Sequence, residues 1–140
     1  MAHPDLDRVF DHLVTFSKKM LDSRGEFAPH GAAIDNGGKL AIFGAQDDSD
    51  RTAAGLIRLI EGYFRTLAAQ KKIRACGLSF DVMVQVPDEG NRKSDAIQCR
   101  LEHANGESVN VFTPWKRGLL GRIQYGKVFA GRGTREIFPG

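Results

Sequence analysis

Histidines, cysteines and carboxylates are the residues of this 140-residue chain whose chemistry could support catalysis or metal binding. Of the four histidines, His30 and His103 are the two that could approach each other across a sheet. Two imidazoles with a nearby carboxylate can bind a metal ion. The spacing does not require one, and a hydrogen-bonded, half-buried histidine at a strand end is the commoner arrangement. We therefore expect neither a metal ion nor a cofactor.

No sequence pattern supports a catalytic nucleophile. The chain lacks the Gly-x-Ser-x-Gly turn of the serine hydrolases. Cys76 and Cys99 fall on the apolar sides of expected strands, where a thiol packs as a small hydrophobic group and its pKa rises. Asp81, Glu102 and His103 could combine carboxylate and imidazole, but Glu102 and His103 are neighbours on one strand and point to opposite faces. We expect a protein without catalytic activity.

Two glycine-containing segments match known loops in part. Residues 121–128 fit Gly-x-x-x-x-Gly-Lys, but Val128 stands where a phosphate-binding loop needs a Ser or Thr for magnesium. Residues 50–61 resemble a calcium loop, but Thr52 and Ala54 stand where oxygen-rich ligands are needed, and the same residues have helical periodicity. Neither segment predicts a site.

Charge is distributed unevenly along the chain. The net formal charge is +3, but residues 115–140 contain six basic residues and one acidic residue, a charge of +5 that leaves −2 for residues 1–114. Cations beside aromatic rings suit nucleic-acid backbones and stacked bases. The alternative is a solvated sheet face that balances acidic helices, with Trp115 covering the open end of the core. The candidate anion-binding or nucleic-acid-binding residues are Lys116, Arg117, Arg122, Lys127, Arg132, Trp115 and Tyr125.

Two amphipathic helices are expected to position these side chains. The apolar residues of Pro4–Arg24 recur near i, i+3, i+4 and i+7, and Gly25 is a suitable stop. A second helix is expected to run to about residue 72, capped by Ser49 or Asp50. Its wider apolar stripe predicts that it packs more deeply than the first helix.

Between the helices, two short apolar runs predict a β-hairpin. A three-residue loop, Asn36-Gly37-Gly38, keeps the apolar side chains of both strands on one face. The expected pairs are Ile34 with Leu40 and Ala32 with Ile42.

After the second helix, the apolar residues alternate with a period of two, which predicts a three-stranded meander. Its strands are residues 73–86, a second strand ending at His103, and Val109–Trp115. A loop of Ala104-Asn105-Gly106 with a glycine bulge would pair Leu101 with Val109 and Cys99 with Val111.

The register of the first two meander strands decides whether the cysteines can meet. If Val86 lies opposite Asp95, Cys99 lies opposite Val82 and far from Cys76. A disulfide needs Cα atoms within about 7 Å, so we expect two reduced thiols.

The C-terminal segment, residues 115–140, is rich in glycine and in basic residues, but it also contains large apolar residues such as Leu119 and Leu120. These are too many for a disordered tail, so a further strand is expected over Gln124–Ala130. We predict one α+β domain over residues 1–140, with two helices packed on an antiparallel sheet. The other sheet face or an edge strand would then be available for pairing.

Three stretches resemble a group of small, uncharacterised bacterial proteins: Gly25–Ala32, Asp95–Trp115 with its Leu-Glu-His-Ala-Asn-Gly core, and Gly126–Pro139. This resemblance implies a single compact domain and assigns no function. The element order, helix, hairpin, helix, three-stranded meander, is also similar to that of roadblock-like and profilin-like modules. That likeness is an analogy of fold alone.

Three functions compete on these grounds. The first is a non-catalytic interaction module, with a protein partner or a second copy in a homodimer. The second is anion or nucleic-acid binding through the basic C-terminal segment. The third is a small-ligand pocket between the second helix and the sheet, with polar contacts from His30, Asp81 and His103.

Localisation follows from what the chain lacks. It has neither a signal-peptide pattern at its N-terminus nor an apolar run long enough to span a bilayer. We therefore expect a cytoplasmic protein and no membrane partner.

Overall fold

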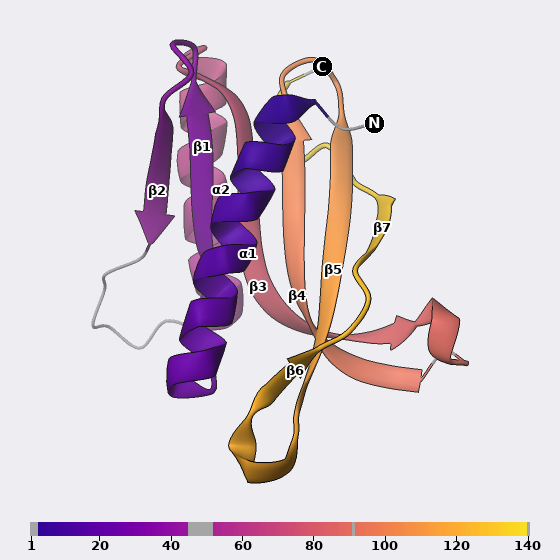
Figure 1. Cartoon of the computed structure of the whole chain (residues 1–140). Coiled ribbons are helices and arrows are strands. Elements are labelled where there is room, and N and C mark those ends of the chain that lie inside the picture. Colours follow the sequence, from indigo (N-terminus) through magenta and orange to yellow (C-terminus); the bar gives the residue numbers. More distant parts are fainter. Residues whose placement is uncertain (1–2, 45–51, 91, 140) are drawn as a thin grey trace.

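The computed structural model describes residues 3–44, 52–90 and 92–139, and it confirms the α+β class (Figure 1). Helix α1 has the bounds expected from the sequence, and Gly25 ends it in the left-handed conformation with φ 77°. The helices are α1 (Pro4–Arg24) and α2 (Ala53–Ala69), with short 3₁₀ turns at Pro87–Glu89 and Leu119–Gly121. The strands are β1 (His30–Asp35), β2 (Leu40–Gly44), β3 (Ile73–Val86), β4 (Arg92–His103), β5 (Ser108–Arg117), β6 (Ile123–Tyr125) and β7 (Phe129–Arg132).

The strands form one curled antiparallel sheet in the order β2-β1-β3-β4-β5-β6 (Figure 1). Both hairpin registers expected from the sequence are confirmed. In the first, Ile34 pairs with Leu40 and Ala32 with Ile42. In the second, Leu101 pairs with Val109 and Cys99 with Val111, and Gly106 adopts φ 107° at the turn.

The register expected between β3 and β4 is wrong. Val86 pairs with Arg92 rather than with Asp95, because β4 begins three residues earlier than its first strongly apolar residues suggest. Cys99 therefore lies opposite Ser79, and Cys76 lies opposite Glu102. The two thiols are on opposite faces of the sheet, and both cysteines are free.

The C-terminal segment folds onto β5 in two short strands, and not as the single strand expected over Gln124–Ala130. β6 pairs with the end of β5 through Arg117 and Ile123, whereas β7 pairs with its beginning through Val109 and Arg132. The residues between β6 and β7 include Gly126, whose backbone N–H donates to the Pro114 carbonyl. The basic segment is thus part of the sheet edge.

The two helices lie on opposite faces of the sheet. Ala32 and Ile34 of β1 pack in the cluster beneath α1, whereas Ala33, between them, packs in the cluster beneath α2. Successive residues of a strand point to opposite faces, so α1 and α2 sandwich β1 and β3. The sheet face opposite α1 is therefore covered by α2 at β1 and β3. That face would be free there if both helices packed on the same side of the sheet.

Helix α2 is packed less deeply than α1, which contradicts the expectation from its wider stripe. Seven residues of α1 are buried but only three of α2, namely Ile60, Phe64 and Ala68. Leu59 of the expected stripe is 47% exposed. The cap of α2 is Thr52, whose hydroxyl accepts from the Gly55 N–H. The expected caps, Ser49 and Asp50, lie outside the described residues.

Within the described part of the chain, neither α1 nor α2 combines the length and the apolar character that crossing a bilayer requires.

Candidate functional site

His103 belongs to a buried cluster centred on Asp5, at the start of α1. The Asp5 carboxylate accepts from His103 Nε2 at 3.0 Å and from Arg74 Nε and Nη2 at 2.8 and 3.2 Å. The His3 side chain caps the helix by accepting from the Asp5 N–H, and its ring lies 4.2 Å from that of His103, centroid to centroid. The cluster joins the first turn of α1 to β3 and to the end of β4.

His3, Asp5 and His103 bring three ligand atoms within 4.8 Å of one another, a spacing that could hold a metal ion. Their hydrogen bonds do not fit that role. His103 Nδ1 accepts from the Asn105 N–H, so its proton is on Nε2, between the ring and Asp5. A metal ion would have to remove that proton and compete with the Arg74 guanidinium for the same carboxylate. The arrangement is that of a closed structural ion pair.

His30 lies at the start of β1 in a second polar cluster, under α1. Its Nδ1 is 3.0 Å from the Ala28 carbonyl oxygen, so Nδ1 carries the proton and donates. Ser17 lies 3.4 Å from Nε2, but its hydroxyl donates to the Leu13 carbonyl of its own helix and contacts Ser79 at 2.7 Å. Ser17 is therefore held as a structural hydroxyl and not as a nucleophile activated by His30.

The thiols of the core also lack nucleophilic character. Burial raises the pKa of Cys99 to about 12, although a hydrogen bond with Ser79 acts in the opposite direction. Burial likewise raises the pKa of Cys76 well above the range of a reactive thiol. Both groups are neutral at physiological pH.

His30 should make folding stability depend on pH. Burial lowers its pKa, and the nearby His12 acts in the same direction, so the folded state binds the proton less readily than the unfolded state. We expect the free energy of unfolding to decrease as the pH falls below about 6.5, the ordinary histidine pKa. Urea unfolding from pH 8 to pH 5 would measure this, with His30→Asn as the comparison because asparagine can still donate to Ala28. Equal pH dependence in the two proteins would contradict this role.

His30, Asp81 and His103 do not share one pocket. His30 lines an open hollow of about 820 Å³ with Phe16, Phe27 and the start of α2. Asp81, on β3, accepts from the indole Nε1 of Trp115, and burial raises its pKa despite that bond. His103 lies at the opposite end of the sheet, beside Ala75 on the neighbouring strand.

The centre of the interface between α2 and the sheet is filled. Phe64 is fully buried there, and a Cβ atom at Gly31 would lie only 2.9 Å from its ring. The packing leaves no room at that point for the small ligand that the sequence allowed.

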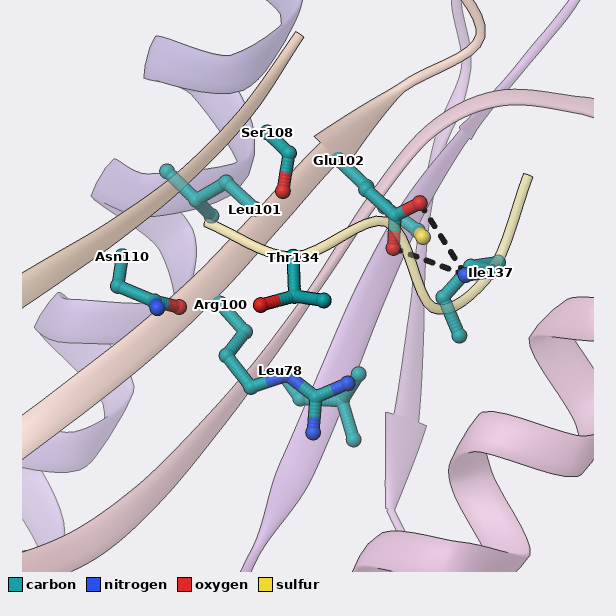
Figure 2. Close-up of a pocket in the computed structure, with 9 residues that line it drawn as sticks. Leu78, Arg100, Leu101, Glu102, Ser108, Asn110, Thr134 and Ile137 are labelled. Carbon is teal, nitrogen blue, oxygen red and sulfur yellow. Dashed lines mark hydrogen bonds between the residues drawn. The ribbon is translucent and has the colours of Figure 1, made fainter. Parts of the chain in front are cut away.

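Glu102 is a buried carboxylate whose partners the sequence did not indicate. It accepts from the backbone N–H groups of Glu136, Ile137 and Phe138, at 2.9 to 3.2 Å. In Figure 2, dashed lines join the Glu102 carboxylate to the backbone nitrogen of Ile137, beside a narrow cavity between β4 and the C-terminal residues. This cavity measures about 10 Å³, enough for one water molecule at most. Glu102 thus fastens the C-terminus to the sheet.

The basic C-terminal residues are spread over the edge of the sheet. Lys116, Arg122 and Arg132 are exposed. Arg117 donates to the Gly25 carbonyl at the end of α1, and Arg135 donates to the His103 carbonyl. Lys127 is exposed and lies beside Glu89 and Phe129.

The two aromatic candidates are engaged within the fold. Trp115 is only 8% exposed and donates to Asp81. Tyr125 donates to Asp22 of α1, and the Lys18 ammonium lies 4.8 Å from its ring centroid. Both side chains are thus held in place by contacts within the fold.

Four exposed apolar side chains lie around the edge strand β2. Ile42 of β2 is 61% exposed, and Phe16 on the α1 side is 42% exposed. On the α2 side, Tyr63 lies 5.2 Å from Phe43 of β2, between ring centroids, and Leu59 is one helical turn before it. This group, Phe16, Ile42, Leu59 and Tyr63, is called the β2 edge surface below.

Sequence reasoning identified an edge strand as a possible pairing site but not this surface. Leu59 was expected to lie in the packed stripe of the second helix, and helical periodicity alone does not reveal how far that stripe is covered. Comparisons of the chain with protein-family models, with curated proteins and with solved structures gave no match.

Proposed function

We propose that this chain is a non-catalytic interaction module that forms a homodimer by pairing its β2 strand with β2 of a second copy. The observation that carries the proposal is the outer edge of β2. Within residues 3–44, 52–90 and 92–139, β2 pairs with β1 alone, so its other side has no strand partner. An edge strand with unpaired N–H and C=O groups is a template for a further strand.

The composition of the edge supports pairing. Leu40–Gly44 contains no charged residue and no proline, and its pairing with β1 runs without a register shift. Edge strands that stay unpaired in solution are usually protected by a lysine, a proline or a bulge. β2 carries none of these devices between its bounds.

The proposed partner is a second copy because antiparallel pairing about a twofold axis makes the strand complementary to itself. With the axis at Ile42, this side chain faces its counterpart, and Leu40 faces Gly44 of the other copy. The flanking side chains of the β2 edge surface would then lose water on both faces of the joined sheet, which favours association.

Replacing Ile42 by lysine should weaken the dimer by about a hundredfold or more, because like charges would face each other across the new strand pair. Size-exclusion chromatography with light scattering at tens of micromolar protein would measure the effect. The wild-type chain should have the mass of a dimer and Ile42→Lys that of a monomer.

Met83→Lys is the matched control, since Met83 is 60% exposed, almost as much as Ile42, but lies on β3 away from the β2 edge. This variant should remain a dimer. A wild-type protein that is strictly monomeric at tens of micromolar would overturn the proposal, as would a Met83→Lys variant that dissociates as readily as Ile42→Lys.

A further inference from the structure

The tip of the hairpin between β5 and β6 presents two leucines to solvent. The tip, residues 118–122, is closed by hydrogen bonds from Gly118 N–H to the Arg122 carbonyl and from Gly121 N–H to the Gly118 carbonyl. Within this turn, Leu119 is 91% exposed and Leu120 is 100% exposed. In Figure 1 the hairpin with β6 extends beyond the lower end of α1, away from the rest of the sheet.

The backbone makes leucine an unfavourable choice at the tip. Leu120 has φ 64° and ψ 19°, in the left-handed region where glycine or asparagine is usual. Its side chain is fully exposed, so the fold gains no burial in return. Strain of this kind is concentrated at functional positions, and here it is combined with exposed apolar surface.

Basic residues flank the two leucines in the sequence. Lys116 and Arg117 precede the tip as neighbours on β5, so they point to opposite faces. Arg122 follows the leucines, and residues 115–135 contain no acidic residue. Arg117 is held at the hairpin base by its bond to the Gly25 carbonyl.

Acidic side chains do occur near the hairpin base, and two of them are paired there. Asp22 accepts from Tyr125, and Glu89 pairs with Arg92 at 3.4 Å. Asp95 lies opposite Trp115, two residues before Arg117. The end of the hairpin is therefore apolar and positive.

We propose that this hairpin tip docks on an anionic lipid bilayer. A planar anionic surface can meet the exposed leucines end-on while Lys116 and Arg122, the exposed cations that flank them in the chain, reach its headgroups. Lys116 lies roughly 7 to 10 Å behind the tip, given about 3.3 Å per strand residue. That spacing places its charge at the headgroups when the leucines enter the interfacial layer, about 5 to 10 Å deep.

The expectation of no membrane partner concerned a different kind of membrane association from this contact. That expectation rested on the lack of a spanning segment and of a signal peptide. A peripheral contact needs neither, since a few apolar side chains and nearby cations are sufficient for reversible binding.

Vesicle co-sedimentation of the full chain tests the proposal. The two vesicle types are phosphatidylcholine alone and phosphatidylcholine with about 30% phosphatidylserine, each at low and at higher salt. The wild-type chain should bind the anionic vesicles, bind the neutral ones at least about tenfold less, and lose affinity as salt is added.

Two double variants separate the apolar and the charged contributions. Leu119→Ser with Leu120→Gly should reduce binding about tenfold or more, and its melting temperature should be unchanged or higher because glycine relieves the left-handed backbone. Lys116→Gln with Arg122→Gln should reduce binding by a similar factor and weaken its salt dependence. Met83→Ser, an exposed apolar position on β3, is the control that should bind as the wild-type chain does.

Several results would overturn the proposal. One is no binding of the wild-type chain to anionic vesicles at low salt. Another is undiminished binding after the leucines are replaced. The cations alone would then account for vesicle binding, and a soluble polyanion such as a nucleic acid would bind equally well. Monomeric Ile42→Lys should still bind, so failure of the homodimer and failure of the membrane contact give different results.

Discussion

Replacing Glu102 by glutamine is expected to lower the free energy of unfolding by about 2 to 3 kcal/mol. The wild-type carboxylate is 5% exposed and accepts three successive backbone N–H groups at the C-terminus. Glutamine keeps one acceptor oxygen but turns an NH₂ group toward donors, so at least one buried N–H of the segment loses its partner.

The lost hydrogen bond should also destabilise the core beneath α2. Ile137 and Phe138, whose N–H groups Glu102 binds, are buried in the cluster that contains Phe64 and Leu78. When their backbone is released, these side chains leave the core more readily, and local opening of the C-terminus comes before global unfolding. Urea unfolding would give the total effect, and limited proteolysis near residue 136 would give the local one.

Glu136→Gln is the matched control for Glu102→Gln, because it makes the same chemical change in the segment that Glu102 holds. Glu136 pairs with Arg65 at 3.6 Å, and both side chains are more than 40% exposed. An exposed pair of this kind contributes about 0.5 kcal/mol or less. If Glu136→Gln destabilised the protein as much as Glu102→Gln, the clamp would not be the main contribution of Glu102.

Local patterns were sufficient to predict the fold class and both hairpin registers. The pairs Ile34 with Leu40 and Leu101 with Val109 follow from alternation alone, since a slip of one residue would turn a whole strand over. The start of β4 was missed because Arg92 and Lys93 are polar and yet pair with β3. Pairing at the exposed end of a long hairpin needs no apolar side chain.

The placement of the helices depended on contacts that periodicity does not encode. An apolar stripe shows that a helix has a buried side, but not which face of the sheet covers it or how completely. Leu59 and Tyr63 therefore had to be seen in the structure before the β2 edge surface could be recognised.

The exposure of the leucines at the hairpin tip was not predicted, for a related reason. Leu119 and Leu120 were counted among the apolar residues that make the C-terminal segment fold, and the segment does fold. These two leucines, however, are exposed, and the burial comes from others such as Ile137 and Phe138. Composition alone does not distinguish apolar residues that drive folding from those that remain outside.

Asp5→Asn should lower the free energy of unfolding by about 2 to 3 kcal/mol at pH 7, because it neutralises a buried carboxylate beside Arg74. The Arg74 side chain is 36% exposed, so water screens part of the interaction. Asparagine would also turn an NH₂ group toward donors from Arg74 or His103, both of which bind Asp5 in the wild-type protein. The first turn of α1 would lose its connection to β3 and β4.

The pH dependence of the destabilisation by Asp5→Asn distinguishes a contribution from the Asp5 charge from one that is due to packing alone. Burial raises the pKa of Asp5, but hydrogen bonds from Arg74 and His103 and the charges of Arg74 and His3 outweigh it, and the pKa lies below its ordinary value of 3.8. The folded state therefore binds the proton less readily than the unfolded state, and the stabilisation is present above about pH 4. It is lost as the pH falls through the lowered pKa of Asp5.

Urea unfolding between pH 7 and pH 2.5 should accordingly show a difference between wild-type protein and Asp5→Asn that shrinks at the acid end. Asp35 and Glu107, whose pKa values are also lowered, remain in both proteins and drop out of the comparison. Asp7→Asn, an exposed carboxylate in the same helical turn, should change stability by about 0.5 kcal/mol or less. A difference for Asp5→Asn that stayed constant down to pH 2.5 would mean that the carboxylate matters for its shape and not for its charge.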